Sequence, residues 1–162
     1  MTDFEKLLRT LAEAGVEFIV VGGVAGAIHG AARLTLDVDV VYARSRENVG
    51  RLVAALAPLR PYLRGAPPGL PFRWDVETVR RGLNFTLTTD AGDLDLLGEI
   101  VGGGGYADLL PHTVVVQVFG TACRCLGLER LIHVKRAAGR PKDLEAIAEL
   151  EAIREEGSPE NP

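Results

Sequence analysis

The sequence predicts an α/β protein in which helices flank a mixed β-sheet, and three features of the chain support this class. Amphipathic helical patterns alternate with short apolar strand patterns, a strand–turn–strand pattern centres on Gly120, and two helical patterns end the sequence. A chain of 162 residues buries enough surface for one core. We therefore expect a single domain over residues 1–156 and a disordered tail over 157–162.

The elements of the first half are predicted from capping residues and hydrophobic spacing. Thr2 and Glu5 fit a capping box at the start of a helix, and Ser45 is suited to cap a later one. Alternating Asp and Val residues are typical of a half-buried strand. The expected elements are helices over 2–14, 24–29 and 45–56 and strands over 17–21 and 36–42.

The second half begins with a segment that holds five prolines and two glycines between residues 58 and 71, which predicts a loop. Beyond it, short strand patterns are separated by turns at Gly92 and Gly120, and the last apolar residues return to helical spacing. The expected elements are strands over 83–88, 94–98, 113–119 and 121–126 and helices over 128–138 and 142–155.

The most informative segment joins the first two predicted strands. Asp37 and Asp39 are alternate residues of a strand, so their side chains share one face and repel each other unless a cation lies between them. Gly22 and Gly23 form a turn that opens into a helix, a place where backbone N–H groups can hold phosphate oxygens. A cation site next to a phosphate site indicates a metal-dependent enzyme that acts on nucleotides.

The complete pattern, G-G-x5-H-G-x2-R-x-T-x-D-x-D over residues 22–39, resembles the nucleotidyltransferase superfamily typified by DNA polymerase β. It is most similar to the small bacterial branch related to abortive-infection and toxin–antitoxin nucleotidyltransferases. The resemblance covers about residues 18–97, with a weaker echo in Lys135 and in the later Arg-x-Lys-Asp. It implies a nucleotidyltransferase fold and the transfer of a nucleoside monophosphate from an NTP to an acceptor hydroxyl, with release of pyrophosphate.

The resemblance also implies the site. Asp37 and Asp39 would bind two Mg²⁺ ions, or Mn²⁺ in their place, and a third carboxylate from a later strand would hold one ion and help to take the proton of the acceptor. Asp93 and Asp95 both qualify, and we favour Asp95 because it lies between two leucines, whereas Asp93 follows a turn glycine. The expected catalytic and metal-binding residues are Asp37, Asp39 and Asp95. The expected nucleotide-binding residues are Gly22, Gly23, Arg33, Thr35 and Lys135.

Each of these residues also has a structural interpretation. The paired glycines can serve only to make a turn with positive φ, and His29 is more typical of a packed, hydrogen-bonded histidine. Arg33 can form an ion pair with a strand carboxylate instead of binding phosphate, and Thr35 can satisfy local backbone groups. The basic cluster of Lys135, Arg136, Arg140 and Lys142 can be a solvated helix end or a triphosphate contact.

Three functions follow from the sequence. The first is nucleotidyl transfer to a macromolecule, such as a tRNA end or a protein side chain. The alternative is a catalytically inactive, antitoxin-like protein that binds a cognate toxin or antitoxin chain. It is considered because the chain has little beyond the core with which to bind an acceptor. A small-molecule modifier, such as an aminoglycoside-type adenylyltransferase, is the third and least favoured function, because no separate substrate-binding lobe is apparent.

Composition and charge bear on the partners, the cysteine chemistry and the cellular location of the protein. A net charge of −4 and a pI near 5.4 disfavour broad, nonspecific binding of nucleic acid. Cys123 and Cys125 are too close along one strand for an unstrained disulfide and are expected to be reduced thiols. No apolar run approaches the roughly 20 residues that span a bilayer, and no secretory pattern begins the chain, so a cytoplasmic protein without membrane contact is expected.

Overall fold

The computed structural model describes residues 1–157, which form a mixed sheet with helices around it. The expected tail therefore lies, apart from Gly157, outside the described residues. The helices are α1 (Phe4–Glu13), α2 (Gly22–Ile28), α3 (Arg46–Leu56), α4 (Val76–Arg81), α5 (Tyr106–Leu109), α6 (Leu128–Ala138) and α7 (Pro141–Glu156), with the 3-10 turns η1 (Ala57–Leu59) and η2 (Leu110–His112). The strands are β1 (Phe18–Val21), β2 (Asp37–Tyr42), β3 (Tyr62–Leu63), β4 (Phe85–Thr89), β5 (Gly92–Leu97), β6 (Glu99–Ile100), β7 (Gly104–Gly105), β8 (Thr113–Val118) and β9 (Thr121–Leu126).

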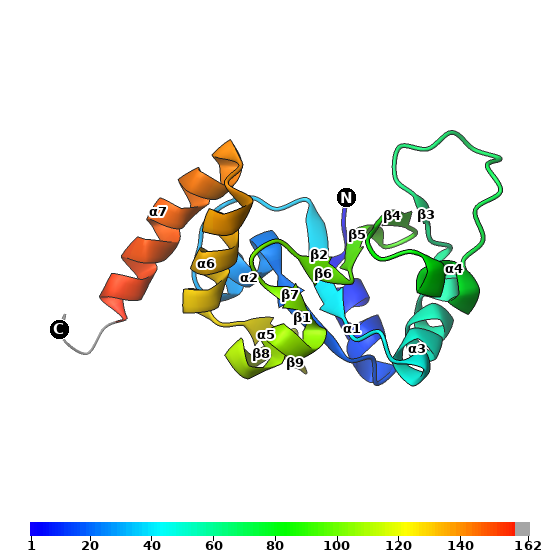
Figure 1. Cartoon of the computed structure of the whole chain (residues 1–162), viewed down its shortest axis with the longest axis horizontal. Coiled ribbons are helices and arrows are strands. Elements are labelled where there is room, and N and C mark those ends of the chain that lie inside the picture. Colours follow the sequence, from blue (N-terminus) through cyan, green and yellow to red (C-terminus); the bar gives the residue numbers. More distant parts are fainter. Residues whose placement is uncertain (158–162) are drawn as a thin grey trace.

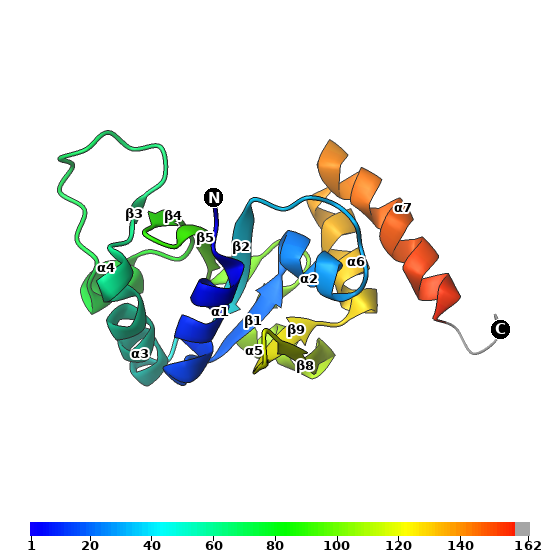
Figure 2. The same cartoon turned by 180° about the vertical axis from the view of Figure 1, so that it is seen from behind.

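The main sheet has the strand order β3-β4-β5-β2-β1-β9-β8. The pairs β2–β5 and β1–β9 are parallel and the other neighbours are antiparallel, so the predicted mixed sheet is confirmed. The strands β6 and β7 make a separate small hairpin from the glycine-rich segment. Helices α6 and α7 pack together at one end of the sheet and α3 and α4 at the other (Figure 1). Seen from behind, α1 lies in front of the strands (Figure 2).

The sheet acquires one apolar face and one polar face from the alternation in its central strands. In β2 the side chains of Val38 and Val40 are fully buried, whereas the two aspartates between and before them are only partly buried. In β5 the buried residues are Leu94 and Leu96, and the aspartates again project from the other face. The strands therefore contribute apolar side chains to the core and carboxylates to one shared surface.

Two expectations about helices were wrong at the residue level. The N-cap of α1 is Asp3, which accepts a hydrogen bond from the backbone N–H of Lys6. Thr2 instead ties the N-terminus to the sheet: its hydroxyl donates to the carbonyl of Leu36 and accepts from the backbone N–H of Asp93. Helix α2 begins at Gly22 itself, two residues before the expected start, so the Gly-Gly pair is the first turn of the helix.

The proline-rich segment is less irregular than predicted. It holds η1 and the short edge strand β3, which pairs with β4, and it is followed by α4, a helix that the sequence patterns did not predict. Asp75 caps α4 by accepting a hydrogen bond from the backbone N–H of Thr78. The loop between β3 and α4 extends well away from the sheet (Figure 1). Among the helices of the described residues, none combines the length and the apolar character needed to cross a bilayer.

Candidate active site

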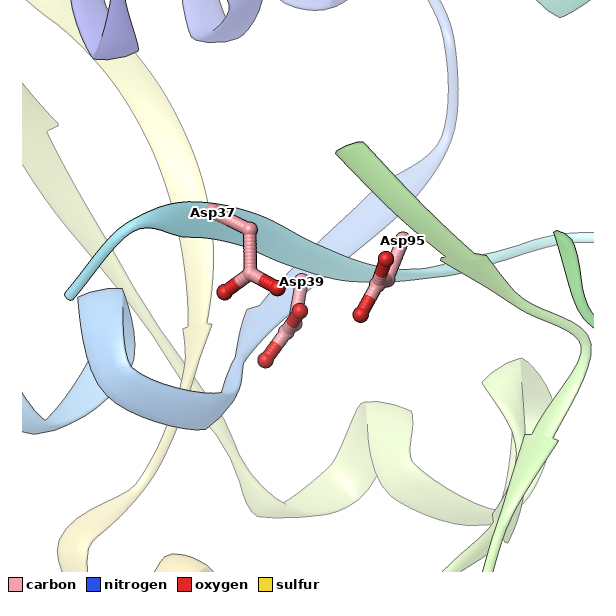
Figure 3. A group of neighbouring side chains, drawn as sticks. All are labelled: Asp37, Asp39 and Asp95. Atoms are coloured by element: carbon pink, nitrogen blue, oxygen red, sulfur yellow. The ribbon is translucent and has the colours of Figure 1, made fainter. Parts of the chain in front are cut away.

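Three carboxylates meet on the polar face of the sheet where β2 and β5 run side by side. The parallel register sets Asp37 opposite Asp93 and Asp39 opposite Asp95. One ligand oxygen from each of Asp37, Asp39 and Asp95 lies within 4.8 Å of the other two. Figure 3 shows these three side chains projecting from the two strands to the same side. The structure thus brings together the three residues that the sequence predicts as metal ligands.

Asp39 is the most deeply buried member of this group, and its electrostatic environment opposes ionisation. Burial, together with the negative charges of Asp37 and Asp95, raises the pKa of Asp39 to about 8, although Lys142 acts in the opposite direction. Burial and the charge of Asp95 also raise the pKa of Asp37, partly offset by Arg64. A cluster of this kind binds protons or cations strongly, because either one relieves the repulsion between the carboxylates.

Arg64 is a member of the site that sequence reasoning missed. The residue follows β3, and its side chain reaches Asp95 Oδ1 at 2.9 Å, Asp37 Oδ2 at 3.5 Å and Asp93 Oδ2 at 3.5 Å. The 2.9 Å contact is an ion pair without hydrogen-bond geometry, so Asp95 Oδ1 and Arg64 Nε remain buried without a hydrogen-bond partner. No sequence signal pointed to this arginine, because it lies in the proline-rich segment.

The donor set fits a divalent metal ion. Asp39 Oδ1 is buried without a hydrogen-bond partner, and an unsatisfied buried carboxylate oxygen is costly unless a cation binds it. All of the donors in the group are hard carboxylate oxygens, which Mg²⁺ and Mn²⁺ prefer over softer ligands. Asp37, Asp39 and Asp95 are therefore the residues that would hold such an ion.

The paired glycines bring backbone close to the carboxylates. Gly22 has a φ of +66°, and a Cβ placed on it would lie 2.0 Å from Asp39 Oδ2. A Cβ on Gly23 would lie 2.7 Å from Thr35 Oγ1, and that hydroxyl donates a hydrogen bond to the carbonyl of Asp37. Both glycines are thus required by close packing against the strand that carries the aspartates. Thr35 has the local backbone contact that its structural interpretation predicts, and its nucleotide-binding role stays a prediction.

Two residues of the sequence pattern have partners other than the carboxylates. Arg33 is exposed and forms an ion pair with Glu145 of α7 at 3.3 Å, not with Asp37 or Asp39. His29 follows the last turn of α2, and its Nε2–H donates to the carbonyl of Leu126 at 2.8 Å. This is the packed histidine that the structural interpretation predicts. A nucleotide contact from Arg33 stays a prediction.

A pocket of about 370 Å³ opens beside Asp39 and Gly22. Apolar side chains of α6 and of the segment after β5 line much of it, and Lys135, Arg140 and Asp143 add charge. Burial lowers the pKa of Lys135, which Asp143 and Asp39 partly offset. Arg140, the residue before α7, pairs with the buried Asp143 in the first turn of that helix at 2.6 Å. Of the predicted basic cluster, Lys135 and Arg140 therefore line the pocket, whereas Arg136 is paired with Glu151.

A larger hollow, of about 770 Å³, lies elsewhere on the surface and holds none of these carboxylates. Its lining includes His29, His112 and His133, together with residues at the start of α6 and the end of α7. We place the candidate site at the smaller pocket, because Asp39, the member of the carboxylate group with a buried and unsatisfied oxygen, lines it together with Gly22.

No family model and no curated protein matches the sequence. Solved structures do match. The lincosamide antibiotic adenylyltransferase LnuA, in its lincomycin-bound structure, aligns with a TM-score of 0.61 at 12% identity, over 94% of this chain and 98% of that one. A protein assigned as a nucleotidyltransferase from Thermotoga maritima gives 0.55 at 15% identity, over 95% and 93%. ANT(2″)-Ia in complex with adenylyl-2″-tobramycin gives 0.53 at 16% identity, over 93% and 91%. The chain therefore has the nucleotidyltransferase fold.

Proposed function

We propose that this protein is a metal-dependent nucleotidyltransferase, which transfers a nucleoside monophosphate from an NTP to an acceptor hydroxyl. The observation that carries the proposal is the approach of Asp37, Asp39 and Asp95 to within 4.8 Å of one another, beside Gly22 and a pocket. In the reaction the acceptor oxygen forms a bond to the α-phosphorus, the bond from that phosphorus to the pyrophosphate oxygen breaks, and the acceptor proton passes to a base.

The residues take the roles that their positions allow. Asp37, Asp39 and Asp95 hold Mg²⁺, which when bound supplies charge neutralisation for the triphosphate and acidifies the acceptor hydroxyl. Asp95 is the candidate acceptor of the proton. Gly22 and Gly23 present the first turn of α2 toward the phosphates, and Lys135, which lines the same pocket as Gly22, contributes a positive charge. Arg33 and Thr35 complete the proposed nucleotide contacts.

The acceptor is the open part of the proposal. We retain a macromolecule, RNA such as tRNA or a protein, as the first candidate. A small hydroxylated molecule is the second, and a specific observation favours it. The lincosamide adenylyltransferase is covered over 98% of its length by this chain, so that protein has no substantial lobe beyond the part matched here. The fact that no separate substrate-binding lobe is apparent in this sequence therefore does not count against a small acceptor.

Labelled NTPs test the reaction directly. The protein is incubated with each NTP, Mg²⁺ and separate macromolecular and small-molecule fractions of a cell extract, and labelled products are resolved from each. We expect transfer by the wild type and loss of transfer in Asp39→Asn. The matched control is Asp90→Asn, which changes an exposed aspartate paired with Arg60 and should leave transfer intact.

Three outcomes discriminate between the functions. Label in RNA or protein supports the first acceptor class, and label in small molecules supports the second. Equal labelling by the wild type and Asp39→Asn, or no labelling with any NTP, counts against catalysis. Copurification of a partner chain in that last case would favour the inactive, antitoxin-like alternative.

A further inference from the structure

Four carboxylates, not three, lie on the polar face of the central strands. Asp37 and Asp39 are alternate residues of β2, Asp93 and Asp95 are alternate residues of β5, and the parallel register pairs them in two rows. The four side chains therefore occupy the corners of a two-by-two patch. The sequence favours Asp95 over Asp93 as a metal ligand, and the contacts in the structure distinguish the four corners further.

Arg64 contacts three of the four corners. Its Nη1 lies 3.5 Å from Asp37 Oδ2, its Nε lies 3.5 Å from Asp93 Oδ2, and its Nη2 lies 2.9 Å from Asp95 Oδ1. Each nitrogen thus faces a different carboxylate. Only a planar guanidinium has three nitrogens arranged to do this, so a lysine at this position would keep the positive charge without all three contacts.

The backbone of the neighbouring strand holds the guanidinium in place. Arg64 Nη2 donates to the carbonyl of Leu87 at 2.7 Å, and the backbone N–H of Arg64 donates to the carbonyl of Thr86 at 3.0 Å. Only 26% of the side chain is exposed. Arg64 is therefore a fixed cation of the patch and not a surface residue that happens to lie near an acid.

Asp39 is the corner that Arg64 does not contact. It lies instead against Gly22 and the pocket, and its Oδ1 is buried without a hydrogen-bond partner. Arg64 also leaves one oxygen free on each of Asp37 and Asp95, since it contacts only Oδ2 of the first and Oδ1 of the second. The oxygens that Arg64 leaves available to a ligand are therefore those of Asp39 and one on each of Asp37 and Asp95.

We propose that Arg64 supplies part of the positive charge that a second metal ion would bring and occupies carboxylate oxygens that such an ion would need, so that the protein without nucleotide binds a single divalent cation. The cation is held by Asp39 and by the oxygens of Asp37 and Asp95 that Arg64 leaves free. This inference rests on the proposed metal-dependent function, and it modifies the two-ion expectation from the sequence. A second ion would need oxygens from the triphosphate, because Arg64 already occupies one oxygen on each of Asp37, Asp93 and Asp95 and offsets part of their charge.

A purely structural role for Arg64 makes a different prediction. If the side chain served only to fasten the start of the β3–α4 loop to the sheet, its charge would not affect how many ions bind. Arg60 provides the matched control, because it precedes β3 in the same segment and pairs with Asp90 at 2.8 Å, where 80% of its side chain is exposed. The two arginines differ in whether they contact the carboxylate patch.

Mn²⁺ titration of the full chain, followed by electron paramagnetic resonance of the free ion, tests the proposal without any assay of activity. The variants are Arg64→Gln, Arg64→Lys and Arg60→Gln, each first checked for a folded circular dichroism spectrum and a cooperative melt. We expect one Mn²⁺ per chain in the wild type, Arg60→Gln and Arg64→Lys. Arg64→Gln should bind two, with the first bound about tenfold more tightly because a nearby positive charge is gone.

The results separate this inference from the function on which it rests. Two ions in the wild type would overturn the role of Arg64 and leave the metal site standing. One ion in Arg64→Gln with unchanged affinity would also overturn it, since the charge would then not limit binding. Absence of Mn²⁺ binding in every folded variant would refute both the inference and the metal-dependent function. If Arg64→Gln does not fold, two ions in the wild type would still overturn the inference.

Discussion

Gly22 lies so close to Asp39 that a single added carbon atom could not fit between them. A Cβ on Gly22 would be 2.0 Å from Asp39 Oδ2 and 2.9 Å from Asp39 Cγ, and the residue has a left-handed φ of +66°. The first turn of α2 and the buried carboxylate are thus in direct contact. This relationship connects the proposed phosphate site to the proposed metal site through one backbone position.

Gly22→Ala should therefore damage both the fold and the site. The left-handed conformation alone costs an alanine about 1–2 kcal/mol, and the clash forces either Asp39 or the start of α2 to move. We expect a lower free energy of unfolding in urea and weaker Mn²⁺ binding.

Gly50→Ala is the control: it lies within α3 with nothing within 4 Å of the new Cβ, so it should stabilise the protein by about 0.5–1 kcal/mol. Unchanged Mn²⁺ affinity in Gly22→Ala would show that the contact does not shape the metal site.

The carboxylate group was predictable from the sequence because it depends on two simple rules. Alternate residues of a strand share a face, and the aspartates of β2 and β5 alternate with buried valines and leucines. The pairing of those strands then brought the two sets together. The preference for Asp95 over Asp93 agrees with the grouping of Asp95 with Asp37 and Asp39, although the role of Asp95 in the reaction stays a prediction.

Arg64 and Asn48 could not be predicted because their contacts depend on tertiary structure. Arg64 is 27 residues from Asp37 and reaches it only because the sheet places β3 and β4 beside β5. Asn48 is a polar residue in a helix that looks solvent-exposed from its neighbours, yet it is fully buried. In both cases the relevant partners come from distant segments, and no local pattern specifies which segments will meet.

Asn48→Ala should be strongly destabilising. The side chain accepts from the backbone N–H of Glu17 at 2.7 Å and donates to the carbonyls of Glu17 and Ala43 at 3.0 and 2.7 Å. Alanine would leave these groups without partners in a buried setting, at a cost of about 2–4 kcal/mol in the free energy of unfolding. Asn84→Ala is the comparison, because Asn84 is exposed and accepts a close hydrogen bond from Gly98 N–H. Urea unfolding should show a clearly larger loss for Asn48→Ala, and equal losses would contradict the assignment.

The metal-free protein should lose stability as the pH rises from about 4 to about 8. Asp39 has a folded pKa of about 8, above its ordinary value of 3.8, so the folded state binds more protons than the unfolded state across this interval. The contribution of protonated Asp39 to the free energy of unfolding is therefore complete below pH 4 and is lost as the pH passes 8. The free energy of unfolding falls over this interval by up to about 1.4 kcal/mol per pH unit. Asp39→Asn should flatten the profile of unfolding free energy measured in the presence of a chelator. A profile that Asp39→Asn leaves unchanged would rule out the elevated pKa.

Divalent ions should reverse that trend. A proton and a metal ion compete for Asp39, so the apparent Mn²⁺ affinity should increase by up to about tenfold per pH unit until about pH 8. Calorimetric titrations at several pH values measure this directly, and they should also show release of protons on binding. The same titrations on Asp90→Asn control for general effects of pH, since Asp90 is outside the patch and its pKa is lowered by Arg60.

Lys135→Met should weaken NTP binding selectively. Lys135 lines the pocket beside Asp39 and Gly22, where a half-buried ammonium group can contact phosphate oxygens. Loss of one charged hydrogen bond predicts an increase of about ten- to a hundredfold in the dissociation constant for NTP in the presence of Mg²⁺, measured by calorimetry.

Arg136→Met is the matched control one residue along α6, because Arg136 is exposed and pairs with Glu151 of α7. It should change NTP affinity by less than about twofold and stability by at most about 1 kcal/mol. Equal effects of the two substitutions would mean that α6 contributes only diffuse charge, and the nucleotide would then have to lie elsewhere than against Lys135.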